Sequence, residues 1–142
     1  MAGVTATAQD RLLLPFDARQ HSRMRVCLES GEYVAVILER GKPLRDGELL
    51  LGNDGRVIQV VAAPEAVLHV SFATPLALIR AAYHLGNRHL SVQIGADFLR
   101  TPEDSVVVDL LAGLGGAITR VVEPFEPEGG AYASPHVVNE AL

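Results

Sequence analysis

The chain has 142 residues, of which 49% are hydrophobic and 20% charged, so it can bury the core of one domain or of two small ones. Its 17 acidic and 12 basic side chains give a formal net charge of -5, which argues against a nucleic-acid binder and against a polybasic membrane surface. The single cysteine, Cys27, excludes an intrachain disulfide and a cysteine-rich zinc site. Because the sequence has neither a bilayer-length apolar run nor a signal-peptide pattern at its start, we expect a cytoplasmic protein.

Residues 11–72 have the pattern of short strands separated by turns. Two runs rich in apolar side chains, 23–28 and 33–38, flank a Gly-containing turn, so we expect them to form a hairpin. A loop is expected at 40–47, where Gly and Pro are dense. The further expected strands are 48–51, 56–63 and 66–72. This spacing predicts a small sandwich or barrel, in which we interpret the thiol of Cys27 as a small packed side chain.

After residue 74 the apolar period changes to that of helices. Thr74 is expected to cap a first helix, Pro75 suits its first turn, and Gly86 is expected to end it. Four apolar side chains follow helical spacing, so we expect them to form the buried face of this helix: Leu76, Ile79, Ala82 and Tyr83.

The rest of the chain predicts a strand, a second helix and a last strand, at 90–94, 102–114 and 117–122. Thr101 is the expected cap of the second helix and Gly115 its stop. The Pro- and Gly-containing segment 123–142 is expected to be mobile or held by a partner. The whole pattern predicts an α+β protein, with a small all-β N-terminal domain at residues 1–73 and an α+β domain at residues 74–142.

No familiar catalytic signature occurs in the sequence, and the informative residues are histidines. His84 and His89 lie on either side of Gly86, and because five residues turn a helix by about 140° they do not form an i,i+4 chelating pair. His84 could bond the last carbonyls of its helix or act as a ligand, while His89, beyond the helix break, can point outward. His69 in a strand and His21 in a polar loop are expected to serve packing or solvation.

A single exposed imidazole such as that of His89 is a poor metal site, because transition metals need several ligands. In a two-fold dimer one residue per chain becomes two facing ligands. His136, in the last segment, could add a further donor after folding over. Such a site would be open and labile, which suits the transfer of a metal better than its retention.

The run at residues 80–89 resembles the signature of the UreE family of urease accessory proteins. The resemblance extends to further runs in both halves of the sequence and covers most of residues 11–136. These runs are 22–26, 40–41, 44–47, 60–65 and 123–132.

The resemblance implies an N-terminal β domain that engages peptide or protein partners, joined to a ferredoxin-like metal-binding domain that pairs head to head in a homodimer. It implies that His89 of each chain binds nickel (Ni2+) at the dimer interface. It further implies a protein that is not an enzyme and that delivers nickel to the urease apoprotein together with other urease accessory proteins, including a GTPase. Zn2+ or Cu2+ could bind the same donors, because affinity order alone does not select nickel.

The sequence departs from the family pattern in two places. Many members have a His-rich tail, whereas the last segment of this chain has His136 alone, so a large storage capacity is not expected. Some members have a His-x-His pair where residues 101–105 offer no imidazole, so peripheral sites built on that pair are not expected. His136 is therefore the second ligand candidate beside His89.

Two other functions remain open from the residues. The chain could be a protein-interaction module that holds a partner segment at a strand edge, with an incidental metal site. A small metal-dependent enzyme is disfavoured, because no positioned general base accompanies the histidines.

Overall fold

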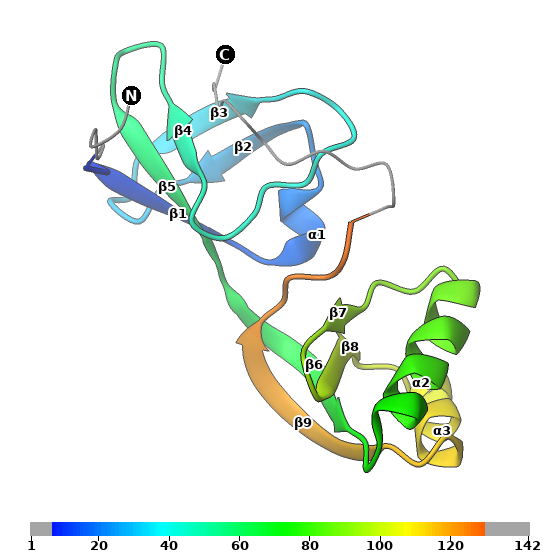
Figure 1. Ribbon diagram of the computed structural model, residues 1–142. Helices are drawn as coiled ribbons and strands as arrows, with labels where there is room; N and C mark the ends of the chain where they lie inside the picture. Colours follow the sequence, from blue (N-terminus) through cyan, green and yellow to red (C-terminus); the bar gives the residue numbers. More distant parts are fainter. Residues whose placement is uncertain (1–6, 130–142) are drawn as a thin grey trace. The chain divides into compact units, whose positions relative to one another are not determined.

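The computed structural model describes residues 7–129, which divide into two compact units with the boundary in the chain between Ala63 and Pro64 (Figure 1). The boundary expected at residues 73 and 74 lies ten residues further along the chain. The difference concerns one strand, 64–71, whose alternating side chains predict a strand without indicating which sheet it joins. None of the helices in residues 7–129 has the length and apolar character that crossing a membrane requires.

The first unit contains five strands and a short helix. Its elements are β1 (Asp10–Leu14), α1 (Phe16–Arg19), β2 (Arg23–Cys27), β3 (Tyr33–Ile37), β4 (Leu49–Leu51) and β5 (Val57–Ala62). The predicted hairpin is confirmed as the antiparallel pair β2–β3, and the order of the second sheet is β1-β5-β4. Strand β1, which the sequence patterns did not indicate, pairs in parallel with β5 and so depends on a contact about 48 residues away.

Alternation along these strands builds the core of the first unit. Leu12 and Leu14 of β1 point inward, as do Val26, Val36 and Val60 from three other strands. Cys27 is instead exposed at the end of β2, so the interpretation of a packed thiol is wrong: the side chains on either side of it, Val26 and Leu28, are the buried ones. Register within the hairpin decides this, because neighbouring side chains lie on opposite faces.

Arg19, at the end of α1, is fully buried in this unit. Its Nε donates to the carbonyl oxygen of Leu14 at 3.1 Å, and its Nη1 donates to that of Leu44 at 3.1 Å. The guanidinium also lies over the ring of Phe16, 5.3 Å from its centroid. A buried cation thus ties the loop after β3 to the end of β1, which no composition or period argument predicts.

The second unit has the order strand, helix, two strands, helix, strand. Its elements are β6 (Pro64–Ser71), α2 (Pro75–Asn87), β7 (Gln93–Ile94), β8 (Phe98–Pro102), α3 (Ser105–Gly113) and β9 (Ala117–Pro124). The sheet order is β7-β8-β6-β9, with every neighbouring pair antiparallel. The predicted α+β class and ferredoxin-like order are confirmed. The helices α2 and α3 pack on one face of this sheet, where Leu68, Val70 and Leu99 meet Leu85 and Leu111 (Figure 1).

Helix α2 begins as predicted, because the Thr74 side chain accepts a hydrogen bond from the Ala77 N–H at 3.1 Å and Pro75 fills the first turn. The predicted buried face is wrong. The helix buries Leu78, Ala81 and Leu85 instead. It leaves three apolar side chains of the expected face 55–67% exposed, namely Leu76, Ile79 and Tyr83. The helix has two apolar stripes at helical spacing, and only the tertiary fold chooses between them.

Two predictions around α3 are also corrected. The strand at 90–94 is shortened to β7, and the stretch that includes Thr101 forms the additional strand β8. Thr101 is buried and its hydroxyl donates to the Ser91 carbonyl at 3.2 Å, so it is not a cap. Asp104 caps α3 instead, accepting from the Val106 N–H at 2.8 Å and the Val107 N–H at 3.3 Å.

Candidate metal site at the end of helix α2

The C-terminus of α2 ends in a Schellman motif whose left-handed position is occupied by His89. The N–H of His89 donates to the Gly86 carbonyl at 2.9 Å, and the N–H of Leu90 donates to the Leu85 carbonyl at 3.2 Å. His89 has φ 58° and is the one non-glycine residue with positive φ within residues 7–129. Gly86, expected to end the helix, lies within its last turn, so that prediction is wrong.

This conformation bears on function because glycine is the residue that such a position favours. A side chain with a Cβ costs roughly 1 kcal/mol or more in the left-handed region, although His tolerates it better than most residues. The motif holds the backbone of His89 by hydrogen bonds and leaves its imidazole exposed. An exposed donor at a strained backbone position is a candidate for function rather than for packing.

His84 lies one turn earlier on α2 and is also exposed. Its ring meets that of Tyr83 edge-on, with centroids 5.4 Å apart. Its side chain makes no hydrogen bond within residues 7–129, so the expected bond to the last carbonyls of the helix is not formed in this part of the chain.

The remaining histidines of the described chain behave as expected. His69 is half-buried on β6, where its ring stacks on that of Phe98 with centroids 4.7 Å apart. Its Nδ1 accepts a hydrogen bond from the Arg100 Nε at 3.2 Å. His21 is exposed after α1. Packing therefore accounts for His69 and solvation for His21.

His136 lies outside the described residues, but the segment that leads toward it is held by its own chain. Phe125 is buried in the second unit. The Glu126 N–H donates to the Gln93 Oε1 at 2.9 Å, and the Glu128 N–H donates to the Val92 carbonyl at 2.8 Å. The prediction that the segment from residue 123 is mobile or held by a partner is therefore wrong for residues 123–128, because β9 and these contacts fix their backbone.

One chain does not assemble a complete metal site in its described part. Within residues 7–129, no three His, Cys, Asp or Glu side chains lie close enough to share a metal ion. What the second unit does offer is an exposed imidazole just beyond the end of α2 and, along that helix, the exposed apolar side chains of Leu76, Ile79 and Tyr83. A second copy of this surface would supply both a cover for the apolar side chains and a second imidazole.

Comparison with known proteins identifies both units. Residues 2–63 match the family model of the UreE urease accessory protein, N-terminal domain, and residues 65–140 match that of its C-terminal domain. A urease accessory protein UreE from Paraburkholderia xenovorans is 48% identical over 136 residues, covering 96% of this chain and 60% of the relative. One from Ralstonia nicotianae is 49% identical over 136 residues, covering 96% and 64%.

A third relative, the urease accessory protein UreE of Ectopseudomonas mendocina, is 48% identical over 132 residues and is covered to 80% of its length. The chain spans only about three fifths of the length of the first two relatives. All three are accessory proteins rather than enzymes. These matches cover both units in order, and the chain belongs to the UreE urease accessory protein family.

Proposed function

We propose that this protein is a metallochaperone that binds nickel (Ni2+) between two copies of the chain through His89 and delivers it to the urease apoprotein. The observation that carries the proposal is the exposed imidazole of His89, held at a left-handed helix end where glycine would be less strained. Membership in a family of urease accessory proteins supports the same role. In this role nickel is the cargo of the protein and not a resident cofactor.

The second ligand comes from a second copy of the chain. The apolar side chains of Leu76, Ile79 and Tyr83, which we call the α2 stripe, are exposed at 55%, 60% and 67% along the helix that ends before His89. A two-fold axis beside this helix would bury both stripes against each other and bring the two His89 residues to the same interface. Burial of one such side chain contributes about 1.5–3 kcal/mol, so two stripes provide enough driving force for a homodimer.

His136 is the proposed further donor. It lies eight positions after Glu128, whose backbone is tied to Val92, and Val92 lies three positions after His89. At roughly 3.3–3.6 Å per residue, eight residues span up to about 28 Å of chain. This length is sufficient for the imidazole of His136 to reach the surroundings of His89 in its own chain or in a partner copy.

The proposed donor set is selective for a class of metals rather than for one ion. Imidazole nitrogens suit nickel, zinc and copper, and Cu2+ binds such ligands more tightly than Ni2+ or Zn2+ does. Zn2+ or Cu2+ would therefore also bind, and nickel is favoured by the metal available to the protein in the cell. Few protein ligands and an exposed position leave coordination places for a receiving site, which suits delivery.

The proposed partners follow from the family: the urease apoprotein and other urease accessory proteins, including the GTPase, in the cytoplasm. Neither nucleic acid nor a membrane is a proposed partner, in keeping with the net charge of -5. The alternative of an interaction module with an incidental metal site predicts partner capture that is independent of nickel. A pull-down with and without nickel, followed by measurement of metal transfer, distinguishes the two.

Titration calorimetry with nickel on a His89→Ala variant tests the proposal. We expect about one Ni2+ per dimer for the parent protein and a loss of affinity of about 100-fold or more for the variant, which exceeds the effect of most outer-shell substitutions. His84→Ala is the matched control, because it removes an exposed imidazole from the same helix and should change the affinity little. Unchanged affinity of a folded His89→Ala protein would remove His89 from the site.

A further inference from the structure

The sheet of the second unit has a face that is turned away from α2 and α3. Leu68, Val70 and Leu99 lie on the face that packs against these helices, so the residues that alternate with them along the strands lie on the other face (Figure 1). Residues directly opposite each other on neighbouring strands share a face. The strand register therefore places four polar residues in one row across the open face, which we call the polar row: Gln93 on β7, Arg100 on β8, His69 on β6 and Thr119 on β9.

Arg100, in the middle of the polar row, is held in place by its neighbours. Its Nε donates a hydrogen bond to the Nδ1 of His69 at 3.2 Å. Its guanidinium lies over the ring of Phe98, 5.1 Å from the centroid, and that ring also stacks on His69. The ring of Phe98 in turn fits closely against Gly95, where a Cβ would collide with it. The guanidinium is therefore preorganised, so a ligand would not have to order the arginine side chain.

The polar row has donors that its own chain leaves unused. A guanidinium has five N–H donors, and Arg100 uses the one on Nε for His69. Because the Nδ1 of His69 accepts that bond, the proton of the neutral ring is on Nε2, which is a second kind of donor. The Oε1 of Gln93 accepts from the Glu126 N–H at 2.9 Å, which leaves the amide NH2 as a third. None of these remaining donors forms a hydrogen bond within residues 7–129.

The described part of the chain also supplies no carboxylate for Arg100, which forms no ion pair within residues 7–129. Glu65 and Glu123 lie opposite each other on the same face, but Glu65 is four residues from His69 along β6, which is roughly 13 Å. An exposed arginine is hydrated, whereas the half-buried Arg100 gives up part of its hydration. In a chain with a net charge of -5, this local cation with unused donors favours an anionic ligand.

The chemistry of the polar row selects a carboxylate among the common anions. A guanidinium binds the planar carboxylate group through two parallel N–H···O bonds. Arg100 is the one charged member of the row, because glutamine, threonine and a histidine that accepts on Nδ1 are neutral. A single positive charge matches a carboxylate better than a phosphate group, whose charge at pH 7 is about -1.5 to -2.

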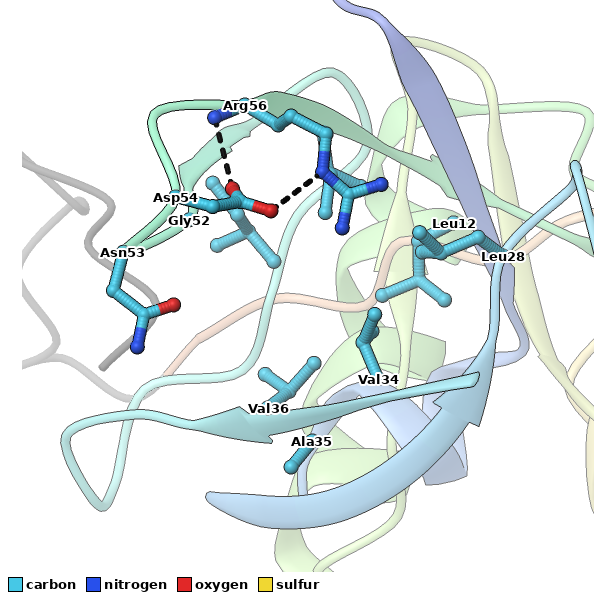
Figure 2. A pocket seen from close by; sticks show the side chains of 11 residues that line it. Leu12, Leu28, Val34, Ala35, Val36, Gly52, Asn53, Asp54 and Arg56 are labelled. Carbon is cyan, nitrogen blue, oxygen red and sulfur yellow. Dashed lines mark hydrogen bonds and ion pairs between the residues drawn. The ribbon is translucent and has the colours of Figure 1, made fainter. Parts of the chain in front are cut away.

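The first unit shows, by contrast, what an enclosed site in this protein looks like. A cavity of about 310 Å³ lies between β3 and the turn that joins β4 to β5 (Figure 2). Its lining is largely apolar, and its polar rim is formed by the turn at residues 52–56. Cavities of this kind can surround a small molecule. The polar row lies on an open sheet face instead, so a small acid bound there would remain largely in contact with water.

The open position of the polar row indicates which source of carboxylate it suits. One charge-assisted contact corresponds to a dissociation constant on the order of 10 mM, which is too weak to retain a free acid. A protein can add contacts beside the row, where three small side chains are exposed on the same face, namely Ser71, Ala117 and Thr119. Small side chains allow the close approach of a partner surface. The carboxylate is therefore best supplied by a side chain of a protein.

We propose that the polar row binds the carboxylate of an acidic side chain on a partner protein. Arg100 donates to both carboxylate oxygens, and the His69 Nε2–H and the Gln93 amide donate to the lone pairs that remain. His69 has a further role as a positioning residue, because its Nδ1 holds the Arg100 Nε. The proposal concerns the open sheet face and depends neither on His89 nor on the α2 stripe.

The test uses the full-length protein without metal and two short peptides with blocked ends, which differ only in a central glutamate or glutamine between two valines. NMR titration follows the Arg100 Nε–H signal and the backbone amides of β6 and β8. We expect the glutamate peptide to shift these signals and to bind about tenfold more tightly than the glutamine peptide. Sodium acetate should bind about tenfold more weakly than the glutamate peptide, and inorganic phosphate no more tightly than acetate.

Three variants test the roles of the residues. Arg100→Met keeps much of the aliphatic stem and should weaken binding of the glutamate peptide about tenfold. His69→Phe keeps an aromatic ring against Phe98 but removes both nitrogens, and should weaken binding about threefold to fivefold. Arg120→Met is the matched control, because Arg120 lies on β9 of the same sheet opposite Leu68, on the face toward the helices. It should bind the glutamate peptide like the parent protein.

Several outcomes would overturn the proposal. Equal binding of the glutamate and glutamine peptides by the parent protein, or no binding of either, would exclude a carboxylate site without reference to how any variant folds. Acetate that binds as tightly as the glutamate peptide would indicate a free acid as the ligand, and tighter binding of phosphate would indicate a different anion. Unchanged binding by a folded Arg100→Met protein would remove Arg100 from the site. None of these results bears on nickel binding through His89.

Discussion

The two units of this chain present different kinds of binding surface. The first unit builds an apolar cavity and a polar rim from its own residues, and an ion pair between Arg56 and Glu32 holds the rim to β3. The second unit presents two exposed imidazoles, those of His84 and His89, and an exposed apolar stripe on α2. The first surface is complete within a single chain, whereas in the proposed function the second becomes a metal site only when another copy supplies a further ligand.

This difference has a consequence for what each substitution should change. A binding surface within one chain should be insensitive to protein concentration. A site shared by two copies should be lost whenever the copies separate, even if every ligand residue is intact. Oligomeric state and metal affinity should therefore vary together in the second unit, and neither should respond to changes in the first unit.

The largest expected effect is that of Ile79→Glu on the dimer. In the proposed dimer the substitution places a charge in the middle of the α2 stripe of both copies and removes two apolar side chains that the interface would bury, which would contribute about 3–6 kcal/mol together. We expect the dimer dissociation constant to rise about 100-fold or more, and nickel affinity to fall with it, as measured by analytical ultracentrifugation and calorimetry.

The matched control for Ile79→Glu is Val106→Glu on α3. Both parent side chains are 60% exposed, so the two substitutions add the same charge to equally accessible apolar positions. Val106→Glu should leave the dimer intact. A dimer that survives Ile79→Glu, or a monomer that still binds nickel tightly, would show that the α2 stripe is not the interface.

The next largest effect is expected for Arg19→Met in the first unit. The substitution leaves the carbonyl oxygens of Leu14 and Leu44 without the donors that Arg19 supplies, and each loss costs roughly 1–3 kcal/mol. We expect the first unit to lose about 2–4 kcal/mol of stability by hydrogen exchange, while nickel affinity changes less than about twofold. Arg11→Met is the control, because the exposed pair with Glu29 at 3.3 Å contributes less than about 1 kcal/mol.

A result in which Arg19→Met also abolishes nickel binding would contradict the separation of the two surfaces. It would mean that the metal site depends on the folded first unit. Hydrogen exchange measured separately over residues 7–62 and 64–129 identifies which unit has opened.

A smaller effect is expected from the backbone of His89. His89→Gly and His89→Ala both remove the imidazole, so nickel affinity should fall equally. Glycine adopts φ 58° without a Cβ penalty, so the metal-free glycine variant should be about 1 kcal/mol more stable than the alanine variant in denaturant unfolding. Equal stability of the two variants would indicate that the left-handed position is not strained.

Helix α2 shows which features can be predicted from the sequence and which cannot. The Thr74 cap is a local feature, set by one hydroxyl and the N–H three residues later, so the sequence predicts it. The buried face is not local: the stripe with Ile79 and the stripe with Leu78 have similar spacing, and the sheet beneath determines which is covered. The face that periodicity predicts for the core is the one that we propose as the dimer interface.

Among the strands, too, the sequence predicts those formed by local pairing and does not predict those that depend on distant contacts. The β2–β3 hairpin was predictable because a turn with Gly31 at φ 98° joins two neighbouring runs. Strand β1 depends on parallel pairing with β5, which is distant in the sequence. Strand β8 is not predicted from the sequence, because Thr101 and Asp104 both have side chains that suit a helix cap. The hydroxyl of Thr101 is taken up by the Ser91 carbonyl, which only the packed sheet reveals.

The candidate site was predictable in its residue but not in its geometry. The run around His89 identified the family, and Gly86 suggested a nearby helix end. One signal could have located that end correctly: Leu85 and Leu90 have the spacing of the hydrophobic pair that accompanies a Schellman motif, with His89 at the left-handed position. Sequence rules favour glycine there, so they do not predict that a histidine occupies the left-handed position.

The smallest expected effect is a pH dependence of the first unit. The hydrogen bonds of Glu32 with Arg56 lower the pKa of Glu32 below its ordinary 4.5, and the backbone and side chain of Arg56 lower the pKa of Asp54 below its ordinary 3.8. A carboxyl whose pKa is lower in the folded state adds stability that is complete above the ordinary value and is lost as the pH falls through the lowered one. The protection of residues 7–62 against hydrogen exchange, measured relative to the intrinsic exchange rate at each pH, should therefore decrease as the pH falls below about 4.5, and more than in an Arg56→Gln variant. Because these groups are exposed, the difference should be small and should shrink in high salt. The second unit serves as the internal reference, and parallel pH profiles for the parent and the variant would show that Arg56 does not hold the rim of the cavity.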